Sequence, residues 1–269
     1  MKNKVVVITG ASSGIGKATA IRFAQAGCNL VIAARNEAKL QETAKIIESL
    51  GAEVLLISAD VSKEADCANM IDKAVQKFGT VDVLINNAGI SMRALFEKLD
   101  LQVMKNVMDV NFWGSIYCTK YALPYLLKSK GSVVGVSSIA GYVGLPARTA
   151  YSASKFALQG FLESLRTENL EKGLHVLIAC PGFTASEIRK RALTADGSAQ
   201  SESPRKEEKM MSAEEVADHI YSAVKGRKQS IVLTREGKLA VFLSKFLPKV
   251  IQKAVFNKMK QEPDSPLNS

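Results

Sequence analysis

The sequence of 269 residues predicts an α/β protein built on a doubly wound, parallel sheet of seven strands with helices on both faces. Short runs of β-branched residues alternate with amphipathic segments of helix length from the first residues onwards. The runs are apolar throughout, as in Val5 to Ile8, which is typical of strands covered on both faces. The segments between the runs supply the helical crossovers that parallel pairing requires.

Local signals place the elements in order. The first strand leads through a glycine-rich turn into a helix, and longer helices are expected at 101–127 and 149–170, the second of which stops before Gly173. Another helix begins at Ser212, because Ser212 and Glu215 have the spacing of a capping box, in which hydroxyl and carboxylate each satisfy an orphan backbone donor. The seven strands are expected at residues 4–9, 29–34, 53–58, 81–86, 131–137, 174–180 and 229–233.

Composition and local character divide the chain into three parts. With 47% hydrophobic and 23% charged residues, residues 1–235 are expected to form one α/β domain around a single large core. Within it, residues 193–211 are polar and Ser-rich, and are expected to be a mobile loop. Residues 236–260 are expected to be a basic, amphipathic helical extension, and residues 261–269 a disordered tail.

The net charge of +10 is concentrated near the C-terminal end. Residues 225–260 hold ten Lys or Arg against one acidic residue. A local basic segment argues against a nucleic-acid-binding surface spread over the fold, and the interleaved aliphatic residues offer no platform for base stacking. No nucleic-acid partner is therefore expected.

The extension carries apolar residues at helical spacing with lysines between them, and Pro248 is expected to kink it or divide it into two helices. Three interpretations of residues 238–260 remain open. The apolar face folds back over a pocket or the core, it makes a peripheral contact with a membrane surface, or it mediates an oligomer contact.

The four cysteines lie far apart, and the two histidines, His175 and His219, have no neighbouring ligands, so no metal site is expected. A strand-like run begins after four residues, which leaves no room for a signal peptide. The longest apolar stretch is too short to span a bilayer. These features predict a reduced, cytoplasmic protein, with peripheral membrane association as an alternative.

A glycine-rich motif follows the first strand and opens the first helix. Gly10, Gly14 and Gly16 allow a tight turn and a close backbone approach where a helix N-terminus can hold a pyrophosphate. The alternative is a plain structural turn between strand and helix.

The end of the second strand indicates which dinucleotide is bound. An NAD site usually has an acidic residue there, whereas this chain has Ala34 and then Arg35. A guanidinium at this place would pair with a 2′-phosphate, which favours NADP(H) over NAD. The alternative is a solvated surface arginine.

Taken together, the motifs resemble those of the short-chain dehydrogenase/reductase (SDR) family. The resemblance covers residues 3–233, and Tyr151 lies thirteen positions after Ser138, as in the family. It implies a Rossmann-type fold. The motifs are the glycine motif, Asn86-Asn87-Ala88-Gly89, Asn111, Ser138, Tyr151-Ser-Ala-Ser-Lys155 and Pro181-Gly182.

The resemblance implies a catalytic set of Asn111, Ser138, Tyr151 and Lys155. Tyr151 would exchange a proton with the substrate oxygen, Ser138 would orient that oxygen, and Asn111 would anchor a water that relays protons. Lys155 would hold the ribose of the nicotinamide. On a helix, the i and i+4 spacing places the ammonium of Lys155 near the phenol, which predicts a lowered pKa for Tyr151.

Cofactor contacts follow from the same resemblance. The pyrophosphate and its ribose would meet the glycine motif, the adenine end would meet Asp60 and Val61, and the carboxamide would meet a hydroxyl after Pro181-Gly182. The implied residues are Gly10, Ser12, Ser13, Gly14, Ile15, Gly16, Arg35, Asp60, Val61, Asn87, Ala88, Gly89, Tyr151, Lys155, Pro181, Gly182, Thr184 and Ser186.

A second Tyr-xxx-Lys pair, Tyr221 and Lys225, has no serine thirteen residues before it and no framing motif, so it is interpreted as a surface pair. The same spacing therefore occurs once with the SDR motifs and once without them.

The resulting hypothesis is an NADP(H)-dependent oxidoreductase that interconverts a ketone or aldehyde and an alcohol. The chain resembles members with C-terminal extensions, such as hydroxysteroid dehydrogenases and 3-ketosphinganine reductases, which implies a hydrophobic, lipid or steroid-like substrate. The family resemblance also implies a homodimer or homotetramer. The alternative is a non-catalytic, NADP-sensing or membrane-associated binding protein of the same fold.

Overall fold

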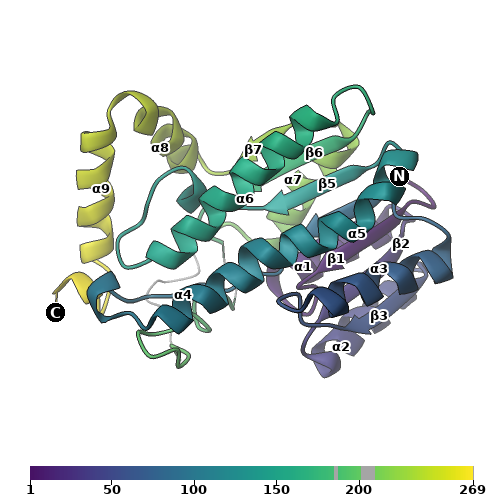
Figure 1. Cartoon of the computed structure of the whole chain (residues 1–269), viewed down its shortest axis with the longest axis horizontal. Helices are drawn as coiled ribbons and strands as arrows, with labels where there is room; N and C mark the ends of the chain where they lie inside the picture. The colour runs from purple at the N-terminus through teal and green to yellow at the C-terminus, as the bar shows by residue number, and fades with distance from the viewer. Residues whose placement is uncertain (185–186, 201–209, 269) are drawn as a thin grey trace.

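The computed structural model describes residues 1–184, 187–200 and 210–268. In this part of the chain, seven parallel strands form one sheet in the order β3-β2-β1-β4-β5-β6-β7, which confirms the predicted fold class (Figure 1). Each expected strand is present within two residues of its predicted bounds. The strands are β1 (Val5–Thr9), β2 (Asn29–Ala34), β3 (Val54–Ser58), β4 (Val83–Asn86), β5 (Ser132–Val136), β6 (His175–Cys180) and β7 (Ser230–Val232).

Helices cover both faces of the sheet. One core lies under α3, α5 and α6, and the other lies under α1, α2 and α7. Successive residues of β1 alternate between these cores, with Val5 and Val7 in the first and Val6 and Ile8 in the second. The helices are α1 (Gly14–Gln25), α2 (Glu37–Ser49), α3 (Glu64–Phe78), α4 (Leu101–Met108), α5 (Gly114–Lys128), α6 (Thr149–Glu168), α7 (Ala213–Lys225), α8 (Arg235–Phe246) and α9 (Pro248–Lys260).

The strand order reverses between β1 and β4. Val7 of β1 is paired with Val31 of β2 on one side and with Leu84 of β4 on the other, and both pairings are parallel. The connections that leave these two strands therefore diverge to opposite sides and open a crevice at their carboxyl ends, which is where doubly wound sheets bind their ligands.

The C-terminal extension forms two helices, because Pro248 interrupts the segment between α8 and α9 and occupies the first turn of α9. Figure 1 shows both helices at one end of the molecule, away from β3 and α2. Ile251 and Met259 of α9 are buried. None of the described helices is both long and apolar enough to cross a bilayer.

Residues 261–268 differ from the disordered tail that the sequence predicts. Glu262 and Ser265 are buried, the Ser265 hydroxyl donates to the Met259 carbonyl at 2.8 Å, and residues 266–268 form a 3₁₀ turn. The polar composition of this short segment does not reveal these contacts.

Part of the loop predicted as mobile, residues 193–211, is also held by hydrogen bonds. Leu193 N–H donates to the Ser91 carbonyl at 2.9 Å, and Gln200 N–H donates to the Ala192 carbonyl at 2.7 Å. Between them, Asp196 accepts from Thr194 and Ser198 in a tight turn, and these hydrogen bonds lower the pKa of Asp196 to about 2. Residues 201–209 of this loop lie outside the described residues.

Candidate active site

The glycine motif forms the turn between β1 and α1. Gly10 has a φ of 68°, and a Cβ atom there would lie 2.9 Å from the Cα of Ala88. A Cβ on Gly16 would collide with the carbonyl oxygen of Gly10. Side chains at these two positions would push the turn away from the loop after β4, so the glycines keep the N-terminus of α1 open toward the crevice.

Asn87 and Thr9 lock this turn in place. The Asn87 amide nitrogen donates to the carbonyls of Thr9 at 2.9 Å and Gly10 at 3.2 Å. The Thr9 hydroxyl oxygen accepts from the backbone N–H groups of Asn87 and Ala88, each at 3.1 Å. The Asn87 side chain therefore holds the glycine turn, and the resemblance implies that Asn87 also contacts the cofactor.

A cleft of about 710 Å³ lies along the carboxyl ends of the strands. Gly16 does not line it, since it packs behind the turn, and Asn111 is buried behind the wall with 1% of its surface exposed. Ser186 lies outside the described residues. The predicted residues that line the cleft are Gly10, Ser12, Ser13, Gly14, Ile15, Arg35, Asp60, Val61, Asn87, Ala88, Gly89, Ser138, Tyr151, Lys155, Pro181, Gly182 and Thr184.

Arg35 and Asp60 lie together at one end of this cleft. Arg35 is exposed, so its guanidinium is available to a ligand. Burial alone would raise the pKa of Asp60, but hydrogen bonds from Ser62 and the positive charge of Arg35 lower it below its ordinary value. The Asp60 carboxylate also accepts from the Ser62 hydroxyl at 2.8 Å, which fixes the loop after β3.

Asn111 lies in a five-residue π-helix, Asp109–Trp113, between α4 and α5. The sequence predicts one continuous helix over 101–127, whereas the structure has a π-helix, with a wider turn, between α4 and α5. The Asn111 side-chain oxygen Oδ1 accepts from Ile90 N–H at 2.8 Å, and the side-chain Nδ2 donates to the Ile90 carbonyl and the Ser154 hydroxyl, each at 2.9 Å. π-helical turns of this kind often occur at functional sites. Through Asn111, this one connects the loop after β4 to α6.

Ser138, Tyr151 and Lys155 meet at the other end of the cleft. Ser138 follows β5 by two residues and caps the next turn, while Tyr151 and Lys155 lie one turn apart on α6. The Ser138 hydroxyl lies close enough to the Tyr151 phenol to lower the pKa of that phenol. The Lys155 Nζ atom donates to the Val136 carbonyl at 2.9 Å and lies 5.7 Å from the centre of the Tyr151 ring.

The electrostatics of this pair differ from the prediction. Burial raises the pKa of Tyr151 above its ordinary value, against the opposing effects of the Ser138 hydrogen bond and the Arg148 and Arg189 charges. Burial lowers the pKa of Lys155 to about 8. The pKa of Tyr151 is therefore raised and not lowered as the sequence predicts, because desolvation outweighs the charges of Arg148 and Arg189.

Gln159 and Ser137 support the site, and sequence reasoning missed both. The Gln159 amide donates to the Ser137 hydroxyl at 2.9 Å, and it packs where a Cβ on Gly141 would collide with it. Gln159 is on the same helix face as Lys155, one turn further on, so its spacing could have identified it. These contacts fix β5 against α6 and hence Ser138 against Tyr151.

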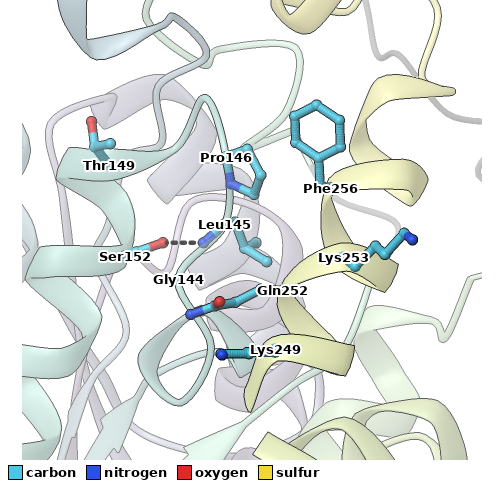
Figure 2. A pocket seen from close by; sticks show the side chains of 9 residues that line it. All are labelled: Gly144, Leu145, Pro146, Thr149, Ser152, Lys249, Gln252, Lys253 and Phe256. Carbon is cyan, nitrogen blue, oxygen red and sulfur yellow. Dashed lines mark hydrogen bonds between the residues drawn. The ribbon is translucent and has the colours of Figure 1, made fainter. Parts of the chain in front are cut away.

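A second, shallower groove of about 750 Å³ lies outside the cleft, between the 144–152 segment and α9 (Figure 2). Figure 2 shows Lys249, Gln252, Lys253 and Phe256 of α9 along one side of it. Leu145 lines both this groove and the cleft, and its N–H donates to the Ser152 hydroxyl at 3.1 Å. The groove and the cleft therefore share a wall.

Comparison with known families agrees with this geometry. The family model described as short chain dehydrogenase matches residues 4–196. The chain belongs to the short-chain dehydrogenase family. The fold and the arrangement of the motif residues around one cleft are thus those of an SDR protein.

A plant hydroxysteroid dehydrogenase resembles this chain over part of its length. "11-beta-hydroxysteroid dehydrogenase A" of Arachis hypogaea is 45% identical over 197 residues, which are 72% of this chain and 56% of that protein. This SDR chain therefore spans little more than half the length of that relative. The match confirms the predicted resemblance to hydroxysteroid dehydrogenases.

Two solved structures share the fold. The short chain dehydrogenase/reductase SDR from Burkholderia phymatum, in complex with NAD, has a TM-score of 0.83 at 26% identity, covering 93% of this chain and 95% of that one. The alcohol dehydrogenase from the archaeon Thermococcus sibiricus, complexed with 5-hydroxy-NADP, has a TM-score of 0.77 at 26% identity, covering 86% and 96%. One structure holds NAD and the other an NADP derivative.

The residues of this SDR chain fit a nicotinamide dinucleotide. The glycine turn leaves the first turn of α1 uncovered, and a Cβ atom on Gly89 would lie 3.2 Å from the Asn111 Oδ1 and 3.6 Å from the Lys155 Nζ. The cleft thus offers a bare helix N-terminus for phosphates at one end and a lysine with two hydroxyls at the other.

Proposed function

We propose that this protein is an NADP(H)-dependent oxidoreductase that interconverts a ketone or aldehyde and an alcohol on a hydrophobic substrate. The observation that carries the proposal is the meeting of Ser138, Tyr151 and Lys155 at one end of a cleft whose other end is a glycine-lined helix N-terminus. A cofactor-sized cleft with an acid–base group at its end suits hydride transfer coupled to proton transfer.

The side chains would act in sequence on the substrate oxygen. When bound, the nicotinamide supplies or accepts the hydride. Ser138 donates a hydrogen bond that orients the carbonyl oxygen, and Tyr151 delivers its phenolic proton to that oxygen in the direction of reduction. Because burial raises the pKa of Tyr151, the phenol is protonated at neutral pH and is ready to donate.

Lys155 and Asn111 would prepare Tyr151 for the next turnover. The Lys155 Nζ lies below the Tyr151 ring and would also hold the nicotinamide ribose. Asn111 fixes the Ile90 backbone and the Ser154 hydroxyl behind the lysine, in the place where a relaying water would be anchored. Reversal of the same transfers oxidises an alcohol.

A spectrophotometric assay tests the proposal: the purified chain, NADPH and a panel of apolar ketones and aldehydes, monitored by NADPH absorbance. Consumption of NADPH with formation of the alcohol is expected. If NADPH binds, by enhancement of its fluorescence, but no member of a panel including steroid and long-chain ketones is reduced, the non-catalytic, NADP-sensing alternative replaces this proposal.

Replacement of Arg35 by Asp is expected to reverse the cofactor preference. The Arg35 guanidinium is exposed at the adenosine end beside Asp60, where it can pair with a 2′-phosphate that a carboxylate would repel. A charge-assisted hydrogen bond of this kind contributes roughly 1.5–3 kcal/mol, so the ratio of kcat/KM for NADPH over NADH is expected to fall about 100-fold. Arg35→Lys should give an intermediate ratio, because it keeps the charge and loses the planar fork. A wild-type preference for NADH would contradict the proposed role of Arg35.

A hydrophobic substrate agrees with the character of the cleft walls and the neighbouring groove. Ile90, Leu145, Ile188 and Leu193 line the substrate side of the cleft, and Phe256 lies beside Leu145 and Pro146 across the groove (Figure 2). Apolar walls on both sides of the shared Leu145 suit a long, water-poor ligand such as a lipid or a steroid-like ketone.

We also propose that α8 and α9 bring the enzyme to a membrane surface from the cytoplasm. Leu239, Phe242 and Phe246 are 58%, 60% and 68% exposed, and the two phenylalanine rings lie 5.2 Å apart. Lysines of the same helices flank this apolar surface. An apolar strip edged by cations is typical of a helix that lies in the interface of an anionic bilayer.

The double substitution Phe242→Ser/Phe246→Ser is expected to abolish vesicle binding. Burial of one phenylalanine contributes roughly 1.5–3 kcal/mol, so loss of two should lower the partition coefficient at least tenfold. Sedimentation with phosphatidylglycerol-containing vesicles measures it, and Leu170→Ser, at an exposed apolar residue beyond α6, is the control. Failure of the unmodified chain to sediment with these vesicles would contradict membrane association.

A homodimer or homotetramer is proposed through the outer faces of α4, α5 and α6. Leu101, Trp113 and Phe156 on or beside these helices are large apolar residues that are 60%, 44% and 45% exposed. Such residues gain by burial against a second copy. Light scattering after size exclusion measures the assembled mass.

A further inference from the structure

Three charged side chains form a buried cluster outside the predicted catalytic and cofactor-binding residues. The Nη2 atom of Arg93 lies 3.6 Å from Oε2 of Glu262, and the Nη2 atom of Arg148 lies 3.9 Å from the same oxygen. The side chains of Arg93, Arg148 and Glu262 are 6%, 10% and 4% exposed. Arginine and glutamate are almost never buried so deeply unless they are paired, because desolvation of each charge is costly.

The cluster joins three segments that are far apart in sequence. Arg93 follows β4, Arg148 precedes α6, and Glu262 follows α9. The Arg93 Nη2 donates to the Pro263 carbonyl at 2.6 Å, and the Arg148 Nη1 donates to the Met92 carbonyl at 2.8 Å. The C-terminal segment is thus tied to the wall of the substrate side of the cleft.

Backbone hydrogen bonds extend these ties to both sides of residues 91–94. Arg93 N–H donates to the Leu193 carbonyl at 2.8 Å, and Leu193 N–H donates to the Ser91 carbonyl at 2.9 Å. Ala94 N–H donates to the Ala147 carbonyl at 3.1 Å. Ser91, Arg148 and Leu193 line the cleft, so this short segment sets the spacing between the substrate loop and the start of α6.

Arg148 is the residue through which the cluster reaches the reacting groups. It is the N-cap of α6, and its carbonyl accepts from Ser152 N–H at 2.8 Å in the first turn of that helix. Tyr151 lies within this turn. Movement of Arg148 would therefore move the phenol relative to Ser138 and to the cofactor end of the cleft.

We propose that Glu262, through Arg93 and Arg148, is a positioning residue that clasps the C-terminal segment onto residues 91–94 and fixes Tyr151 in its reactive place. This role rests on the proposed function, since it concerns the same reaction. The clasp couples docking of α8 and α9 to the geometry of the active site. Release of the tail would loosen the first turn of α6.

The charge balance of the clasp also acts on the phenol. In the described part of the chain, the groups that act on Tyr151 include Ser138, Arg148, Lys155, Cys180 and Arg189. Arg148 favours the phenolate, and the Glu262 carboxylate partly neutralises Arg148. Loss of the carboxylate leaves the Arg148 charge uncompensated, so the phenol releases its proton at lower pH. A residue that only stabilised the fold would not lower the pH at which the phenol releases its proton.

Glu262→Gln in the full-length chain tests the clasp. It is expected to lower kcat at least about tenfold, since small misplacements of a catalytic group are costly, while the dissociation constant of NADPH stays within about twofold. The basic limb of the pH profile for carbonyl reduction should move to lower pH. Asp264→Asn is the matched control, because Asp264 is an exposed carboxylate two residues away.

Hydrogen exchange followed by mass spectrometry gives a readout that does not need turnover. Glu262→Gln should speed amide exchange in residues 91–94 and 148–152 as well as in 249–268. Faster exchange confined to 249–268, or wild-type kcat with an unmoved pH limb, would show that Glu262 only anchors the tail and would overturn the proposal. If the wild-type chain reduces no carbonyl, the proposed function fails, and the exchange pattern still decides whether the clasp exists.

Discussion

Replacement of Tyr151 by Phe is expected to lower kcat/KM for carbonyl reduction by about three orders of magnitude. General acid catalysis contributes typically about 10²–10⁴ in rate, and Tyr151 is the acid placed beside Ser138 at the end of the cleft. The ring itself is retained, so packing on α6 and binding of the dinucleotide should change little. Stopped-flow NADPH oxidation measures the change in kcat/KM, and NADPH fluorescence titration measures the binding of the dinucleotide.

Tyr221→Phe is the matched control, because Tyr221 also precedes a lysine by four residues. Its ring packs edge-on against Phe23 at 5.3 Å and under the Arg22 guanidinium at 3.8 Å, on the far side of the sheet from Tyr151. Activity of this variant should equal that of the wild type. Comparable activity of Tyr151→Phe and Tyr221→Phe would show that the phenol of Tyr151 donates no proton.

The sheet could be predicted from sequence because its signals are local. A strand that is covered on both faces is mostly apolar, as Val5 to Ile8 are, and this pattern is visible without tertiary information. The break between α4 and α5 could not be predicted in this way. The π-helix at Asn111 depends on hydrogen bonds to Ile90 and Ser154, which are 21 and 43 residues away.

The active site shows the same division. The glycine turn and the Tyr151 and Lys155 spacing are short motifs, so the residues could be named from sequence. Their pKa shifts could not, since burial depends on the whole fold and reverses the expected effect on Tyr151. The Glu262 clasp was hidden because Arg93 and Glu262 are 169 positions apart and lie in segments with no motif.

Lys155→Met is expected to abolish turnover and at the same time to stabilise the protein near neutral pH. Lys155 is almost fully buried, and burial lowers its pKa from 10.5 to about 8. A shift of this size corresponds to roughly 3 kcal/mol of unfavourable free energy for folding with the ammonium protonated. Loss of the hydrogen bond to the Val136 carbonyl offsets about 1 kcal/mol or more of the gain.

The pH dependence of unfolding separates this effect from packing. The unfolded chain keeps its lysine proton up to about pH 10.5, whereas the folded protein releases it near pH 8. Between these values the unfolded state binds more protons, so the stability that Lys155 removes returns as the pH rises. Lys155→Met should therefore have a larger free energy of unfolding than the wild type at pH 7, and this difference should be smaller by about 2 kcal/mol at pH 9.5.

Urea denaturation of the two proteins at both pH values measures this difference, and titration of all other groups cancels in the comparison. Lys225→Met provides the control, because Lys225 is the exposed lysine of the second pair. If the difference in free energy of unfolding between Lys155→Met and the wild type is the same at both pH values, Lys155 keeps its ordinary pKa and its ammonium is solvated in the cleft. A difference that becomes smaller at pH 9.5, together with lost turnover, would show that the protein is less stable because it holds this ammonium beneath Tyr151.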